Sequence, residues 1–255
     1  MPPPNSGPPT PKGEARFDQD YFERVYNVEG VSRLDIHWWA NRYYARLAER
    51  LLRRAGGRRF LDIGCGQGFT LARLSAGVEA WGIEISEYAA ARCASFAPGA
   101  RVVLGNIDDK TPEGLPAGGF DVVMARYILE HLRDPGAAMK RCASLVRPGG
   151  YFFFSVPNMR SPGRRIKKDQ WFAYLDETHI SLLEPREWLE LTAAAGLETD
   201  KFFTDGFWDV PYVRYVPKIL QYGLFSLPTI ASVLFVTTLL PMPWGENLLV
   251  IARKK

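Results

Sequence analysis

A glycine-rich turn that follows an apolar run is the part of the sequence best suited to holding a ligand. The run contains Asp62, and glycines follow at the alternate positions Gly64, Gly66 and Gly68. A buried parallel strand that enters a tight turn has this pattern. Glycines let the backbone approach a ligand closely, and a helix after the turn would direct unpaired N–H groups at it. We therefore expect a strand, a ligand-binding turn and a helix over residues 69–76.

A dinucleotide site is the first alternative for such a turn. The dinucleotide fingerprint is G-x-G-x-x-G, whereas Gly68 comes one residue earlier than that spacing requires. Glu84 ends a second apolar run, where a carboxylate can accept hydrogen bonds from a ribose diol. A turn that binds nothing and a strand-end glutamate at the surface are the structural alternatives. The spacing between the turn and Glu84 favours the functional interpretation.

Several segments, in order along the chain, resemble the motifs of the class I S-adenosylmethionine (SAM)-dependent methyltransferases. The turn is similar to their first motif, D-x-G-x-G-x-G, and the later segments resemble methyltransferase types 11 and 12. That group includes the ubiquinone-biosynthesis O-methyltransferases. The resemblance covers residues 58–157, with a looser match over 175–197. The segments that carry it are residues 60–68, 81–85, 104–109, 120–132 and 145–150.

The resemblance implies which residues hold SAM. Glu84 would hold the ribose, and Ile85 would lie against the adenine face. Asn106 stands where the family often has an aspartate that binds the adenine amino group, with Ile107 N–H beside the ring nitrogen; Asp108 is the alternative to Asn106. With the turn at the methionine end, the expected SAM-binding residues are Asp62, Gly64, Cys65, Gly66, Gly68, Glu84, Ile85, Asn106, Ile107, Ala125, Tyr127 and Tyr21.

Three histidines are the candidates for a catalytic base. The sulfonium already makes the methyl group electrophilic, so the protein must position the acceptor and remove a proton from a hydroxyl. His131 follows the fourth predicted strand, and His179 lies in a segment that resembles the family's substrate-side motif. We predict that both are catalytic candidates, although each could instead be structural, and that His37 is structural. The sequence shows no metal-ligand cluster, so we predict no metal.

Alternating strands and helices must position these residues. The alternation predicts a parallel sheet with helices on both faces, and ligands bind outside the carboxyl ends of such strands. The resemblance implies a Rossmann-like, doubly wound α/β sheet of seven strands in the order 3-2-1-4-5-7-6, the last antiparallel. Apolar runs predict strands at residues 59–64, 79–85, 101–105, 120–126, 150–156, 198–204 and 247–253. Helical patterns fall at residues 17–55, 69–76, 86–96, 135–146 and 185–195.

Length and composition indicate one domain with a flexible start. The chain has 255 residues, enough for a single α/β core. We predict a disordered Pro/Gly-rich tail over residues 1–16 and a methyltransferase domain over 17–255, with a helical cap at 17–57 and an apolar insertion at 205–245. The net charge of +4 is too small to indicate nucleic acid. The scattered cysteines and the lack of a leader-like start favour a cytoplasmic location.

An uncharged stretch and a basic loop bear on the acceptor. Residues 219–245 carry no charge, and residues 160–168 carry five cations. Cations beside an apolar surface suit an anionic membrane, but a lid over the acceptor or a dimer face is the preferred interpretation of the stretch; Pro228 argues against a span. We predict SAM-dependent O-methylation of a small-molecule, lipid-linked or glycosyl-linked acceptor, with S-adenosylhomocysteine (SAH) as product. The alternatives are N- or C-methylation, or a non-catalytic SAM-binding or membrane-associated partner protein.

Overall fold

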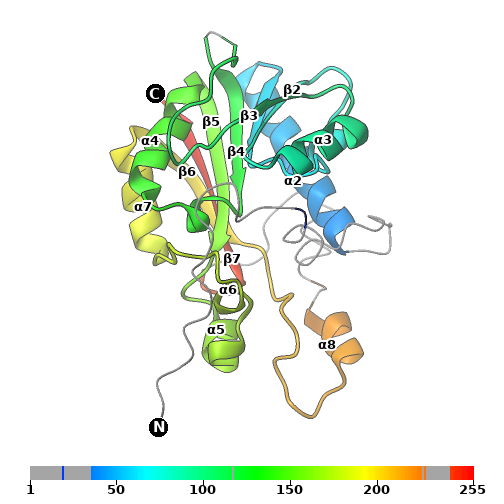
Figure 1. Ribbon diagram of the computed structural model, residues 1–255. Coiled ribbons are helices and arrows are strands. Elements are labelled where there is room, and N and C mark those ends of the chain that lie inside the picture. The colour runs from blue at the N-terminus through cyan, green and yellow to red at the C-terminus, as the bar shows by residue number, and fades with distance from the viewer. Residues whose placement is uncertain (1–18, 20–35, 117, 226, 228–241) are drawn as a thin grey trace, which may run out of the picture.

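A seven-stranded sheet forms the centre of the protein (Figure 1). The computed structural model describes residue 19 and residues 36–116, 118–225, 227 and 242–255. Strand order is β3-β2-β1-β4-β5-β7-β6, and β7 runs antiparallel to both of its neighbours. Both features of the predicted topology are confirmed. The strands are β1 (Arg59–Ile63), β2 (Glu79–Glu84), β3 (Arg101–Leu104), β4 (Phe120–Arg126), β5 (Val146–Pro157), β6 (Leu197–Thr204) and β7 (Asn247–Lys254).

Helices cover both faces of this sheet (Figure 1). On one face pack α2 (Ile36–Ala55) and α3 (Glu87–Phe96), and on the other pack α4 (Pro135–Leu145) and α7 (Pro185–Ala194). Side chains of β4 alternate between the two faces, because Val122 and Met124 pack with α2 while Val123 and Ala125 pack with α4. The shorter elements are η2 (Leu71–Arg73), η3 (Leu129–His131), α5 (Pro162–Lys167), η4 (Lys168–Gln170), α6 (Phe172–Leu175) and α8 (Lys218–Phe225).

Polar caps determine where the main helices begin and end. The Ser86 hydroxyl accepts a backbone hydrogen bond at the start of α3, and the Asp134 carboxylate does the same for α4. Glu184 opens α7 in a reciprocal capping box. Gly56 ends α2 with φ of 65°, a left-handed conformation that glycine adopts at low cost. These local signals explain why the predicted bounds of α3, α4 and α7 are close to the observed ones.

The helix predicted over residues 69–76 is wrong. Only the short 3-10 helix η2 forms there, with hydrogen bonds from Arg73 N to Thr70 O and from Leu74 N to Leu71 O. Few residues separate the glycine turn from Gly77 and the start of β2, and nucleating a helix is costly over such a length. The turn is therefore not followed by the helix N-terminus that we expected to face the ligand.

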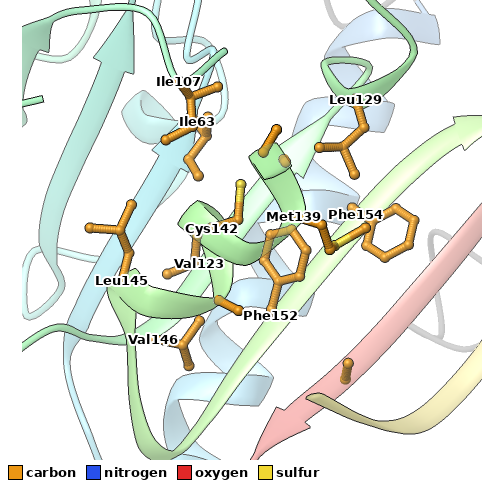
Figure 2. Close-up of a cluster of buried hydrophobic side chains, with 14 of the residues drawn as sticks. Ile63, Ile107, Val123, Leu129, Met139, Cys142, Leu145, Val146, Phe152 and Phe154 are labelled. Atoms are coloured by element: carbon orange, nitrogen blue, oxygen red, sulfur yellow. The ribbon is translucent and has the colours of Figure 1, made fainter. Parts of the chain in front are cut away.

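The core between the sheet and α4 is built from large, fully buried side chains. Figure 2 shows Met139 and Cys142 of α4 against Phe152 and Phe154 of β5. Phe154 also lies near Trp188 of α7, with ring centroids 6.1 Å apart. All five side chains are at most 1% exposed. This packing fixes β5 and, beside it, β4; the carboxyl end of β4 carries residues predicted for the site.

The carboxyl-end edge of the sheet carries the short helices. Figure 1 shows α5, α6 and α8 beyond this edge, opposite the C-terminus. In the described part of the chain, no helix is both long enough and apolar enough to cross a bilayer. The predicted tail 1–16, Tyr21 and much of the 219–245 stretch lie outside the described residues.

We expect Phe154→Ala to lower the free energy of unfolding by about 3–5 kcal/mol, because it opens a cavity in a packed core. Phe202→Ala is the matched control, since Phe202 lies on the same sheet and is 47% exposed; it should change stability by less than about 0.5 kcal/mol. Urea titration followed by circular dichroism measures both. Equal effects of the two substitutions would contradict this account of the core.

Candidate active site

A cavity of about 190 Å³ opens at the carboxyl ends of the central strands. It lies where the strand order reverses between β1 and β4, the place at which doubly wound sheets bind ligands. Most residues predicted from sequence meet there. Those that line the cavity are Asp62, Gly64, Cys65, Gly66, Glu84, Ile85, Asn106, Ile107, Tyr127 and His131.

Three predicted residues that the structure describes do not line the cavity. Gly68 lies against Cys93 of α3, and Ala125 is fully buried in the core on the α4 face. His179 lies behind His131, with the two ring centroids 4.7 Å apart. The structure therefore places these three behind the cavity wall.

The glycine turn is held close to its neighbours. Gly64 has φ of 70°, and a Cβ added there would lie 2.0 Å from Cδ1 of Ile128. Gly68 has φ of 80°, and a Cβ there would lie 2.3 Å from Sγ of Cys93. Both positions therefore require glycine for conformation and for space. The result is a compact turn whose backbone forms part of the cavity wall.

Glu84 connects this turn to the end of β2. Its Oε2 accepts a hydrogen bond from Gly66 N at 2.7 Å, and its Oε1 accepts from Ile85 N at 3.0 Å and Ser86 N at 2.9 Å. Burial raises the pKa of Glu84, and these backbone hydrogen bonds oppose that rise. Because a carboxylate has about four lone-pair sites, Oε2 keeps room for a ribose hydroxyl. The carboxylate thus has one acceptor site left for a ligand hydroxyl.

The cavity wall near Asn106 and the wall near Asp62 present different polar groups. Asn106 lines the cavity, whereas Asp108 accepts from Arg133 Nε at 2.8 Å and is not part of the lining. The Asn106 Oδ1 atom already accepts from Asp108 N at 2.9 Å and has a second lone pair. Burial raises the pKa of Asp62 well above its usual value, and the charge of Arg126 opposes that rise. A purine edge and an amino-acid end would meet suitable groups.

A hydrogen-bond chain fixes the ring of His131. The Thr178 hydroxyl donates to Asp176 Oδ1 at 2.5 Å, so towards His131 Nδ1, 2.8 Å away, its oxygen acts as the acceptor. Nδ1 of His131 therefore carries a proton, and in the neutral ring Nε2 has the lone pair. His179 Nδ1 must likewise donate to Ala173 O at 2.8 Å.

Burial lowers the pKa of His179, with opposition from that hydrogen bond and from Asp176. Burial alone would raise the pKa of Asp176, but hydrogen bonds from Thr178 and the two neighbouring histidines bring it below its usual value. Asp176 is thus ionised near neutral pH while His179 is neutral. The buried loop holds a charged acceptor for Thr178 and a neutral ring behind His131.

Glu130 completes a compact group with His131 and His179. Glu130 is fully buried, and neither of its carboxyl oxygens has a hydrogen-bond partner among the described residues. Burial raises its pKa to about 8, so it is mostly protonated at neutral pH. One ligand atom from each of Glu130, His131 and His179 lies within 4.8 Å of the others, an arrangement that could hold a divalent cation. Metal independence therefore stays a prediction.

The cavity also contains residues that the sequence motifs did not predict. Asn41 and His37 reach it from α2, Thr70 from the segment after the turn, and Met124 and Arg126 from the end of β4. A charge at the end of the apolar run of β4 was the available sequence signal for Arg126. Asn41 had none, because only the fold brings that helix to the cavity, and His37, which we predicted to be structural, also lines the cavity.

Comparison with known proteins places this fold and site in a family. The profile of a methyltransferase-domain family matches residues 37–201. A ubiquinone biosynthesis O-methyltransferase of Aromatoleum aromaticum is 40% identical over 139 residues, which cover 52% of this chain and 57% of that protein. One of Paraburkholderia phymatum is 31% identical over 187 residues, covering 67% of this chain and 74% of that protein. The chain spans about half to two thirds of the first such relatives, at 57%, 53% and 66%.

Solved structures agree at the level of the fold. Magnesium protoporphyrin IX methyltransferase of Synechocystis PCC 6803, solved with bound SAH, has a TM-score of 0.63 at 13% identity, and the match covers 95% of this chain and 98% of that one. The cavity lies at the switch point of the same fold, and its Glu84, glycine turn and Asn106 fit the parts of SAM. The chain thus belongs to the methyltransferase-domain family and has the fold of SAM-dependent methyltransferases.

Proposed function

We propose that the protein transfers the methyl group of SAM to a hydroxyl oxygen of a small molecule. One observation carries this proposal: a carboxylate suited to a ribose, Glu84, and a histidine with a fixed tautomer, His131, line the same cavity. The relatives named as O-methyltransferases support oxygen as the methylated atom. N- or C-methylation is the alternative reaction, and a non-catalytic SAM-binding partner protein is the alternative role.

The residues divide the work of methyl transfer. Bound SAM supplies an electrophilic methyl group, so the carbon–sulfur bond breaks as the oxygen–carbon bond forms and SAH leaves. Glu84 holds the ribose, and Asn106 with Ile107 holds the adenine. His131 accepts the hydroxyl proton at Nε2, because Thr178 keeps the proton on Nδ1. Positioning by the cavity wall supplies the remaining rate enhancement.

His179 has a supporting role in this proposal. It lies behind His131 and does not line the cavity. Its Nε2 lies 3.8 Å from Asp176 Oδ2, beside the chain that orients His131. A neutral His179 keeps this buried region free of a second positive charge when His131 takes a proton. His179 thus assists the base by packing behind the His131 ring and by adding no positive charge beside it.

We also propose that the acceptor is lipid-linked and is reached at the cytoplasmic face of a membrane. On α8, Ile219 is 75% exposed and Leu224 is 66% exposed; exposed cations are Lys218 at the start of the helix and Arg214 in the segment before it. This helix lies beyond the same sheet edge as the cavity (Figure 1). Apolar side chains beside cations suit an anionic membrane surface. A lid over the acceptor and a homodimer face are the alternatives for this apolar helix.

The basic loop contributes less free charge than its sequence indicates. Arg160 pairs with Glu184 at 3.2 Å, and Lys167 pairs with Asp209 at 2.5 Å. Arg164 donates to Met159 O at 2.7 Å. Three of the five cations therefore have partners within the fold, and α8 is the stronger support for membrane contact.

Glu84→Ala should weaken SAH binding by at least about 10-fold, because it removes a charge-assisted hydrogen bond to the ribose and loosens the glycine turn. Calorimetric titration with SAH measures the loss. Glu79→Gln is the matched control, since Glu79 lies at the opposite end of β2 and pairs with Arg59. Unchanged SAH affinity in a folded Glu84→Ala sample would contradict the assignment of the donor site.

His131→Gln should lower kcat by about 10²–10⁴-fold and leave the SAH dissociation constant unchanged, because the base acts only in the chemical step. Single-turnover assays with a phenolic acceptor and calorimetry with SAH separate the two effects. Ser181→Ala is the control, as it removes a hydrogen bond to Leu132 O in the same loop and does not line the cavity. A normal kcat in His131→Gln would assign the base elsewhere.

The double variant Ile219→Glu with Leu224→Glu should abolish sedimentation with vesicles that contain phosphatidylglycerol, because carboxylates resist burial at the acyl boundary. Wild type should sediment with these vesicles and much less with phosphatidylcholine alone. Lys140→Glu makes the same change of two charges on α4 and should bind normally. If the double variant instead changes only the sedimentation equilibrium mass, α8 is a dimer face.

A further inference from the structure

Arg126 is a cation in the cavity wall whose charge acts on Asp62 without a direct ion pair among the described residues. It ends β4, lines the cavity, and takes part in none of the ion pairs among the described residues. Its Nη1 donates to Asn41 Oδ1 at 2.6 Å. A guanidinium has five N–H donors, so Arg126 retains donors for an anion. A partly buried charge of this kind gains from an anionic ligand.

Aromatic rings and α2 hold the guanidinium in place. Its central carbon lies 4.6 Å from the ring centroid of Tyr44 and 5.2 Å from that of Tyr127. Asn41 Oδ1, which binds Arg126, also accepts from the Thr70 hydroxyl at 3.3 Å. Arg126 is therefore tied to the segment that follows the glycine turn. A planar, fixed guanidinium is well suited to a carboxylate.

Asp62 shares the sheet face of Arg126. Asp62 of β1 is the direct partner of Met124 on β4, and Arg126 comes two residues later on the same face. Both Asp62 and Arg126 line the cavity. One carboxyl group and one guanidinium at neighbouring strand ends match a zwitterion, which carries one ammonium and one carboxylate group.

We propose that Arg126 binds the α-carboxylate of the methionine moiety of SAM and that Asp62 receives its ammonium group. The inference rests on the proposed use of SAM as methyl donor. An anionic acceptor is the competing ligand for Arg126. The link through Asn41 to Thr70 favours the donor, because it places Arg126 at the end of the cavity that the glycine turn forms.

Calorimetry with two ligands tests the proposal. SAH and 5′-methylthioadenosine share the adenosine and the thioether sulfur, but only SAH has the amino-acid end. Arg126→Met should raise the dissociation constant of SAH by about 10- to 100-fold and that of 5′-methylthioadenosine by less than about twofold. Only SAH loses a charge-assisted contact in this variant. Arg126→Lys should recover part of the SAH affinity because it restores the charge.

Arg101→Met is the matched control. Arg101 is stacked on an aromatic ring as Arg126 is, 5.1 Å from the Trp81 centroid, and does not line the cavity. It should bind both ligands as wild type does. Equal losses of both ligands in Arg126→Met and Arg126→Lys would show a structural role and overturn the proposal. Normal SAH affinity with a raised acceptor KM would overturn it in favour of an anionic acceptor.

Failure of the proposed function gives a different result. Wild-type protein that is folded and binds neither SAH nor 5′-methylthioadenosine would refute SAM as the donor. If wild type binds both ligands with similar affinity, the donor site stands and a charged contact to the amino-acid end is refuted. The two ligands together therefore separate the role of Arg126 from the identity of the cofactor.

Discussion

The hydrogen bonds of the Glu84 carboxylate join the two parts of the chain that make the cavity. Its oxygens accept from the glycine turn after β1 and from the backbone where β2 passes into α3. A buried carboxylate is stable in its charged form only with such partners, and the three N–H groups would be unsatisfied without it. The same atom that holds Gly66 also has the lone pair left for a ribose hydroxyl. Loop structure and donor recognition therefore depend on one side chain.

The sheet could be predicted because burial on both faces leaves a strong signal. The centres of β4 and β5 are apolar runs, residues 122–125 and 151–154, since strands covered by helices on both faces need apolar side chains at successive positions. The helix predicted at 69–76 does not form, because eight residues with helical spacing cannot show whether the chain has room for a helix. The distance from the turn to the start of β2 decides that, and it is a property of the fold.

The site residues also fall into those that local sequence predicts and those that only the fold brings together. Local sequence is enough to identify Gly64, Gly66 and Glu84, because a turn and a strand end are defined by a few neighbouring residues. The orientation of His131 depends on Thr178, 47 residues away in the chain, and no local pattern records that contact. Arg126 is a similar case, since its held geometry comes from Asn41 and Tyr44 on α2. Sequence therefore located the residues proposed to bind the donor, while the fold assembled the group around His131 and the contacts that hold Arg126.

Charge balance explains how one cavity tolerates two buried acids. Burial raises the pKa of both Asp62 and Glu84, so an empty cavity resists carrying two full negative charges. Backbone hydrogen bonds stabilise the ionised form of Glu84, whereas the nearby charge of Arg126 stabilises the ionised form of Asp62. A ligand that brings an ammonium and a sulfonium stabilises the ionised form of Asp62, and its carboxylate neutralises Arg126. In the proposed complex the donor supplies the opposite charges that both side chains lack. The cost of burying Asp62 and Arg126 without a ligand then favours a ligand that carries both signs of charge at one end.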